Sequence, residues 1–155
     1  MTVVDPATKS AAVAAALCDL FTGITGLTEI LDHEPVGQEH LPPYAYLAEW
    51  DGQGIGIDEL GHELSKDDYA EVWTVRLVHT LDAPEESIPA VRSLVLQMVA
   101  ACNDDATLAG SNPTGEVREA VAISWGAAPD EDDPPKRRMM RGHVEIAVLY
   151  LLPSQ

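Results

Sequence analysis

The stretch Tyr69-Ala-Glu-Val-Trp-Thr-Val-Arg-Leu-Val-His-Thr-Leu81 is the longest strand candidate in the chain. In an extended conformation its side chains alternate, so that one side carries Trp73, Val75 and Leu77 and the other carries Val72, Thr74, Arg76 and Val78. A period of two residues over such a length is typical of a β-strand. The fold is therefore expected to contain a sheet that includes this segment.

Shorter alternating runs predict four further strands, at residues 27–33, 44–50, 116–125 and 143–152. In the second of these runs, the residues expected to share one face are Tyr44, Tyr46, Ala48 and Trp50. The last run is apolar on both faces near its end, which is typical of a strand inside a sheet and not at its edge.

Two helices are predicted, one before the strands and one between them. Asp5-Pro6 suits the start of a helix, because Asp is a good N-cap and Pro is tolerated at the first helical position. Pro84 and Pro89 bracket the start of the second helix, and Asn103-Asp104-Asp105 ends it. Its apolar face at helical spacing is formed by Val91, Leu94, Val95, Met98, Val99 and Cys102. Helices that separate groups of strands predict an α+β fold: a mixed, mostly antiparallel sheet of about five strands with the two main helices packed on it.

The length and composition fit one domain over residues 1–155, with 46% apolar residues. Two cysteines, Cys18 and Cys102, cannot build a disulfide framework, and their apolar surroundings indicate core positions. The longest apolar run, Ala11 to Cys18, is far shorter than the roughly 20 residues that cross a membrane. No membrane association is expected.

The chain is strongly acidic, with 26 Asp and Glu against 9 Lys and Arg and a net charge of -17. This charge disfavours nucleic acid as a simple partner, because phosphate attracts positive groups. Four of the nine basic residues fall within six positions: Lys136, Arg137, Arg138 and Arg141. Just before them, residues 129–135 are acidic and rich in proline, which predicts a mobile loop over residues 127–142.

Such a loop is either a solvated segment that neutralises its own charge or a segment that orders on assembly. In the second case its basic residues are expected to pair with acids of a neighbouring subunit. The candidate partners are Asp67, Asp68, Glu85 and Glu86.

The sequence carries no recognisable catalytic or cofactor motif. Gly52, Gly54 and Gly56 alternate after a predicted strand, but the third glycine of a dinucleotide fingerprint is missing, since position 57 is Ile. His79, His143 and Glu145 could hold a metal only if the three side chains converged, and exposed strand histidines are commoner than ligands. We expect no enzymatic activity, no cofactor and no metal.

The order of the predicted elements resembles that of the tail terminator (tail completion) proteins of long-tailed bacteriophages. The residues that carry the resemblance are an N-terminal helix and the segments Leu27-Thr-Glu-Ile-Leu31, Pro43-Tyr-Ala-Tyr-Leu47, Trp73-Thr-Val-Arg-Leu-Val-His79, Ile88 to Ala101, Glu119-Ala-Val-Ala-Ile-Ser-Trp125 and Val144-Glu-Ile-Ala-Val-Leu-Tyr150. They cover nearly the whole chain as an order of elements, without a diagnostic motif.

The resemblance implies a structural virion protein that forms a hexameric ring at the head-proximal end of the tail tube. Such a ring ends tube polymerisation and offers a surface to the head-completion or connector protein. The protein would be assembled in the host cytoplasm, and DNA would pass through the lumen without specific binding. The charge of this chain agrees with that role, because a negative lumen repels DNA.

Other functions remain open at the level of sequence. The nearest is another neck or tail protein, either a head-completion protein or a tube subunit. A function of a different class is small-ligand binding, with Tyr44, Tyr46 and Trp50 lining a pocket. A third is an acidic DNA mimic or regulatory protein, although these acids are dispersed along the chain.

Overall fold

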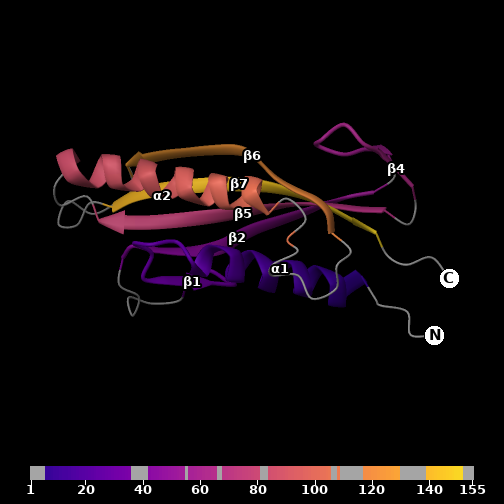
Figure 1. Cartoon of the computed structure of the whole chain (residues 1–155), viewed down its shortest axis with the longest axis horizontal. Helices are drawn as coiled ribbons and strands as arrows, with labels where there is room; N and C mark the ends of the chain where they lie inside the picture. Colours follow the sequence, from indigo (N-terminus) through magenta and orange to yellow (C-terminus); the bar gives the residue numbers. More distant parts are fainter. Residues whose placement is uncertain are drawn as a thin grey trace.

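The computed structural model describes residues 6–35, 42–54, 56–65, 68–80, 84–105, 108, 117–129 and 139–151. In this part of the chain, helices and strands follow one another in the order α1 (Pro6–Thr22), β1 (Glu29–Leu31), β2 (Tyr44–Gln53), β3 (Gly56–Ile57), β4 (Glu63–Leu64), β5 (Asp68–Thr80), α2 (Pro84–Asp104), β6 (Val117–Pro129) and β7 (Met139–Leu151). Figure 1 shows the two helices lying on one side of a long twisted sheet.

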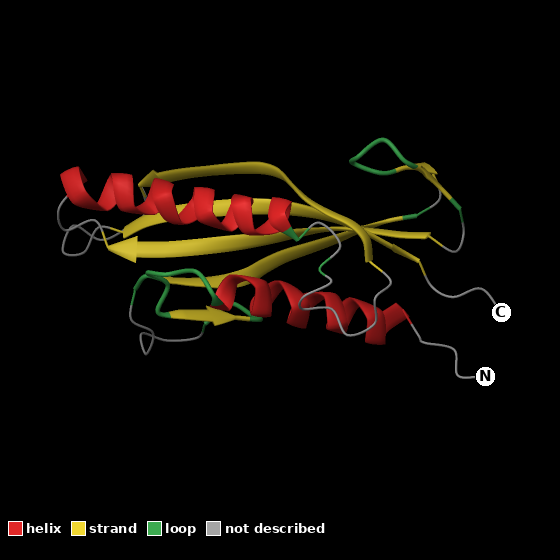
Figure 2. Cartoon of the chain, viewed as in Figure 1, coloured by secondary structure: helices red, strands yellow, loops and turns green. Residues whose placement is uncertain are grey.

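The main sheet has five strands in the order β1-β2-β5-β7-β6. Only β1 and β2 run parallel, and the other neighbours are antiparallel. A second, two-stranded sheet of β3 and β4 extends beyond one end of the main sheet (Figure 2). The predicted fold class is confirmed: the protein is α+β, with a mixed, mostly antiparallel five-stranded sheet and two packed helices.

Both helices and one face of the sheet share a single apolar core. From the helices it takes Leu17 and Phe21 of α1 and Val91 and Met98 of α2, all at most 1% exposed. The sheet supplies residues of β2, β5, β6 and β7, among them Ala45, Leu47, Trp73, Val75, Leu77, Ala122, Val144, Ile146 and Val148. No helix in the described part of the chain combines the length and hydropathy needed to span a bilayer.

The boundaries of the helices follow from local chemistry. Helix α1 starts at Pro6, as predicted, and the chain leaves it through Gly26, whose φ of 107° suits a residue without a Cβ. Helix α2 starts at Pro84, the first of the two prolines expected to bracket its start. Its first turn contains Glu85 and Glu86, whose charges are favourable at the positive end of the helix dipole.

The prediction that Tyr44, Tyr46, Ala48 and Trp50 share one face is wrong. A β-bulge between Leu47 and Glu49 leaves Ala48 without a partner on β5 and reverses the alternation beyond it. Tyr46 is paired with Arg76 on the face away from the helices, whereas Trp50 is paired with Trp73 on the helix-bearing face. The three aromatic residues therefore cannot line one pocket.

The predicted mobile loop over residues 127–142 is shorter than expected. Residues 127–129 belong to β6 and residues 139–142 belong to β7, and these two strands pair with each other up to Pro129 and Met140. The remainder of the predicted loop lies outside the described residues. Strand β2 also continues to Gln53, beyond the predicted end at residue 50, and the β3–β4 hairpin, which was not predicted, follows it.

Helix α2 lies close to the sheet at Gly142 of β7. A Cβ atom at this position would lie 2.7 Å from Cγ2 of Val95 and 3.4 Å from Leu77. Separations under 3 Å between carbon atoms are repulsive, so the absence of a side chain at Gly142 lets α2 lie flat on β5 and β7. A glycine inside a strand often marks such a close approach.

Substitution of Gly142 should therefore destabilise the fold. We expect Gly142→Ala to lower the free energy of unfolding by about 1–3 kcal/mol through overpacking. In the double variant Gly142→Ala with Val95→Ala, the decrease in the free energy of unfolding should be smaller than the sum of the two single decreases. Removal of the Val95 methyl groups leaves space for the new methyl group at position 142. Urea unfolding measures the stability of the two single variants and of the double variant. Gly23→Ala is the control, because a Cβ at that position would meet nothing within 4 Å. A strictly additive double variant would contradict this contact.

Candidate functional site

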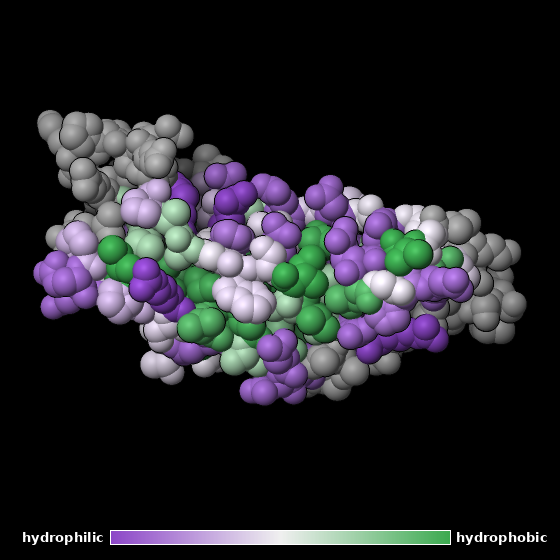
Figure 3. All heavy atoms as spheres, turned by 90° about the horizontal axis from the view of Figure 1, so that it is seen from above, coloured by the Kyte–Doolittle hydropathy of each residue, from purple (hydrophilic) through white to green (hydrophobic). Residues whose placement is uncertain are grey.

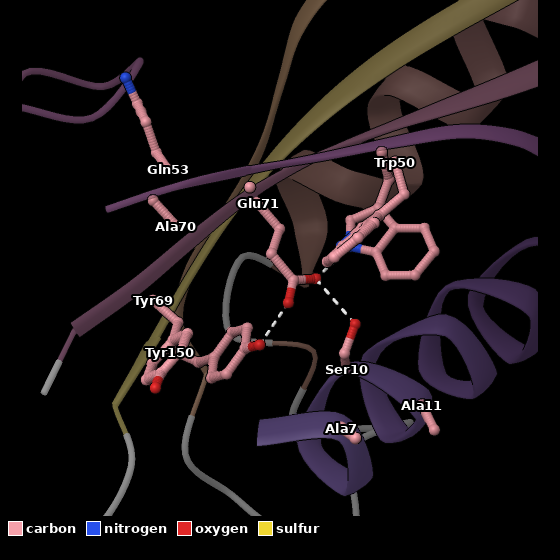
Figure 4. Close-up of a pocket in the computed structure, with 11 residues that line it drawn as sticks. Ala7, Ser10, Ala11, Trp50, Gln53, Tyr69, Ala70, Glu71 and Tyr150 are labelled. Atoms are coloured by element: carbon pink, nitrogen blue, oxygen red, sulfur yellow. Dashed lines mark hydrogen bonds between the residues drawn. The ribbon is translucent and has the colours of Figure 1, made fainter.

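A groove of about 800 Å³ lies between the first half of α1 and the sheet. Its lining residues are Ala7, Ser10 and Ala11 of α1, Trp50, Gly52 and Gln53 of β2, Tyr69, Ala70, Glu71 and Trp73 of β5, and Tyr150 of β7. Figure 4 shows Ser10, Glu71 and Tyr150 pointing toward one another between the helix and the strands. The register explains this meeting, since Tyr69 and Glu71 on β5 face the helices with Tyr150 and Val148 of β7.

Glu71 forms the polar centre of the groove. Its side chain is buried, with 4% of the residue exposed, and its carboxylate accepts three side-chain hydrogen bonds. Ser10 Oγ donates over 3.2 Å and Trp73 Nε1 over 2.9 Å to Oε2, and the Tyr150 hydroxyl donates to Oε1. These bonds replace the water that the carboxylate loses on burial.

Aromatic rings form the walls around this carboxylate. The Tyr69 and Tyr150 rings are stacked, with centroids 5.7 Å apart and planes 11° from parallel. The Trp50 and Trp73 rings lie 6.3 Å apart in a tilted arrangement, and Trp50 is 55% exposed. Such rings provide a large contact area at low cost in side-chain entropy, which is typical of binding surfaces.

The hydroxyl of Tyr150 remains a hydrogen-bond donor in the groove. Burial, and then the hydrogen bond to Glu71, raises the pKa of Tyr150 above its usual value, so the phenol stays protonated and keeps donating. No His, Cys, Lys or second carboxylate is among the lining residues that the structure describes. Among the described lining residues, the Glu71 carboxylate is the charged group that could attract a cation.

Other buried titratable groups have structural positions. Lys9 of α1 is 2% exposed, and burial lowers its pKa. Burial raises the pKa of the Cys18 thiol to about 11 and that of the Cys102 thiol to about 12. Both thiols are therefore uncharged near neutral pH and unsuited to act as nucleophiles. Cys102 lies in the core as expected, whereas Cys18 is half-buried and packs against it.

The predicted interface residues are placed only in part. Arg141 lies in β7 beside Val78, and Asp68 begins β5, so the two are separated by about 33 Å along the sheet. Glu85 and Glu86 are exposed at the start of α2. Lys136, Arg137, Arg138 and Asp67 lie outside the described residues. The predicted pairing between subunits stays a prediction.

The histidine candidates do not converge. His79 lies on the helix-bearing face of β5, whereas His143 and Glu145 face the other side of the sheet, beside Arg76 and Thr74. Within the described residues, no group of three or more His, Cys, Asp or Glu side chains could hold a metal ion. His62 has a structural environment instead. Its Nδ1 lies 3.0 Å from Asp58 and its Nε2 lies 3.1 Å from Glu119 of β6.

Sequence reasoning missed the groove and its central residue. One signal was present: Glu71 interrupts the apolar face formed by Trp73, Val75 and Leu77, and a charge at such a position is either exposed or held by donors. Ser10 and Tyr150, which lie 61 and 79 positions from Glu71, could not be identified as its partners without the fold.

Comparison with known proteins adds no identification. No protein-family model matches the chain, and no curated protein shows significant similarity to it. The functional argument therefore depends on the sequence and the structure.

Removal of the Glu71 carboxylate tests the hydrogen-bond cluster. Glu71→Gln keeps one acceptor oxygen and should lower the free energy of unfolding by about 1–2 kcal/mol. Glu71→Leu leaves the donors of Trp73 and Tyr150 without an acceptor and should cost about 3 kcal/mol or more. Urea unfolding at pH 7 compares the two, with Ser10→Ala as the variant that removes only the longest bond. A Glu71→Leu variant as stable as the wild type would show that the cluster does not stabilise the fold.

The raised pKa of Tyr150 predicts a loss of stability in alkali. Above about pH 10 the unfolded chain releases the phenol proton while the folded protein retains it. Unfolding is thereby favoured as the pH rises, with a slope from this group of up to about 1.4 kcal/mol per pH unit. The stability advantage of the wild type over Tyr150→Phe should therefore shrink between pH 9 and 11 in urea titrations. Parallel pH profiles for the two proteins would contradict this assignment.

Proposed function

We propose that this protein is a structural virion component that assembles into a ring at the head-proximal end of a bacteriophage tail tube. The observation that carries the proposal is that exposed aromatic residues lie at opposite edges of one sheet. Trp50 on β2 is 55% exposed and Trp125 on β6 is 48% exposed. Both lie on the helix-bearing face, on strands separated by β5 and β7.

Apolar surfaces at opposite edges support head-to-tail association of identical subunits. In a closed ring, one surface of each copy meets a different surface of the next copy. The edges themselves are also suited to contact. β6 is 13 residues long and has no described strand on its outer side, and β1 covers only Tyr44, Ala45 and Tyr46 of β2. Unprotected strand edges of this length usually pair with or are covered by something else.

The order of elements and the net charge also support the proposed ring. The two helices and the strands of the main sheet follow one another in the order that resembles the tail terminators. With a net charge of -17 per copy, a ring would surround its lumen with negative charge, and DNA would pass without adhering. Tube termination and joining to a head-completion protein would then occur at the two faces of the ring.

Native mass spectrometry of the purified protein tests this proposal. We expect a species of six copies, and negative-stain images should show rings, with extra density at one end of purified tail tubes after incubation. Trp125→Asp should abolish the six-copy species without unfolding the protein, because Trp125 is half exposed. The pair Arg137→Glu and Arg138→Glu tests the predicted basic contact in the same assay.

The control for Trp125→Asp is Ile57→Asp, because Ile57 is also exposed but lies on the small β3–β4 sheet. It should leave the rings intact. A protein that stays monomeric at high concentration and does not bind tube ends would contradict the proposal.

A further inference from the structure

Helix α2 has an exposed outer face on the side opposite its buried residues. We call the exposed residues of this face the ridge: Pro89, Arg92, Ser93, Leu96, Gln97 and Ala100, which line an open hollow at the surface. Leu96 is 55% exposed, and Arg92 lies one turn before it, also exposed. Leu and Arg four residues apart lie on the same side of a helix. Figure 3, seen from the side of α2 and β6, shows apolar side chains in a band across the surface with hydrophilic ones around them.

We infer that the α2 ridge of one copy docks into the groove between α1 and the sheet of the next copy. Leu96 packs against the exposed ring of Trp50, and the Arg92 guanidinium faces the Glu71 carboxylate. This inference rests on the proposed ring and names the contact that would join its subunits.

Charge complementarity identifies a second copy as the occupant. Arg92 is the only charged residue of the ridge, and Glu71 is the only charged residue among the described lining of the groove. A carboxylate has about four acceptor positions, and the bonds from Ser10, Trp73 and Tyr150 use three of them. An arginine is also the cation best suited to stack on an indole such as that of Trp50.

The groove and the ridge both present apolar surface. The groove has a volume of about 800 Å³ and mostly apolar walls, with the small side chains of Ala7 and Ala11 on its helical side. On the ridge, Leu96 and Ala100 one turn later form an apolar stripe along an exposed helix face, and such helix faces can bind in apolar grooves. Aromatic and arginine residues are the side chains that most often dominate binding energy at interfaces.

The ridge and the groove of one copy cannot meet. Helix α2 contacts β7 at Gly142, whereas the groove reaches β7 at Tyr150, about 26 Å farther along the strand. Figure 1 shows α2 and the start of α1 toward opposite ends of the molecule. Two complementary surfaces at different places on one subunit produce head-to-tail association, which closes into a ring when the rotation between copies permits.

A mixing experiment with two sets of variants tests the inference. Arg92→Glu with Leu96→Asp removes the ridge and leaves the groove, and Trp50→Asp removes the groove contact and leaves the ridge. Each variant alone should raise the apparent dissociation constant of self-association by at least about 30-fold in analytical ultracentrifugation. An equimolar mixture should form 1:1 heterodimers and nothing larger, because it contains one intact ridge and one intact groove per pair.

Matched variants separate this effect from general charge or misfolding. Arg118→Glu with Asn103→Asp changes exposed residues outside the ridge and gives the same net charge, and it should assemble as the wild type does. Ala11→Glu is a second groove variant at an exposed helical position and should act as Trp50→Asp does. Circular dichroism and thermal unfolding establish that each variant is folded.

The outcomes distinguish this inference from the proposed function. Six-copy rings that survive both the ridge and the groove variants would overturn the ridge-and-groove contact and leave the ring intact. The contact would be supported if the mixture of variants forms heterodimers. The tail-tube role would be overturned if the wild type forms open chains and never binds tube ends. If neither variant self-associates and the mixture also forms no heterodimers, the inference is overturned. An intact ridge and an intact groove would then be insufficient for association.

Discussion

Strand β5 is paired on both sides, with β7 along all of its 13 residues and with β2 along most of them. This double pairing determines which side chains face the helices, because alternate residues of a paired strand must point to opposite faces. Trp73, Val75 and Leu77 are thereby placed in the core, and Glu71 is placed on the same face two residues earlier. A charge in this position is costly unless donors reach it, so the cluster around Glu71 is a consequence of the register of β5.

The two faces of the sheet have different roles because of this register. The helix-bearing face holds the core, the groove and the two exposed tryptophans. The opposite face carries polar pairs such as Glu49 and Arg76, whose side chains lie 2.7 Å apart at the surface. The β3–β4 hairpin covers only one end of that face, where Leu64 packs with Ala70 and Leu149. Self-association on the helix-bearing side would leave this opposite face, with its Glu49–Arg76 pair, free for other partners.

Folding leaves few basic side chains on the surface of this acidic protein. Of the basic residues whose side chains are described, Lys9 is buried and Arg76 is paired with Glu49. Arg92 is among the few that remain on the surface, beside an exposed leucine. On a body with a net charge of -17, subunits repel one another at long range. Association then requires a local contact in which apolar burial and a cation–carboxylate pair outweigh that repulsion, which is the arrangement inferred for the ridge and the groove.

The sequence by itself determined the fold class, the order of the two helices and the five strands of the main sheet, and the faces of β5 and β7, because apolar periodicity is a local property that survives folding. It also placed Cys102 correctly in the core, whereas Cys18 is half-buried and packs against the core. Only the tertiary structure decided which aromatic residues share a surface, because a single extra residue at Ala48 reverses the alternation of β2 and separates Trp50 from Tyr44 and Tyr46. Likewise, only the fold brought Ser10 and Tyr150 to Glu71, since contacts across 61 and 79 positions depend on strand register and helix docking and not on any local pattern.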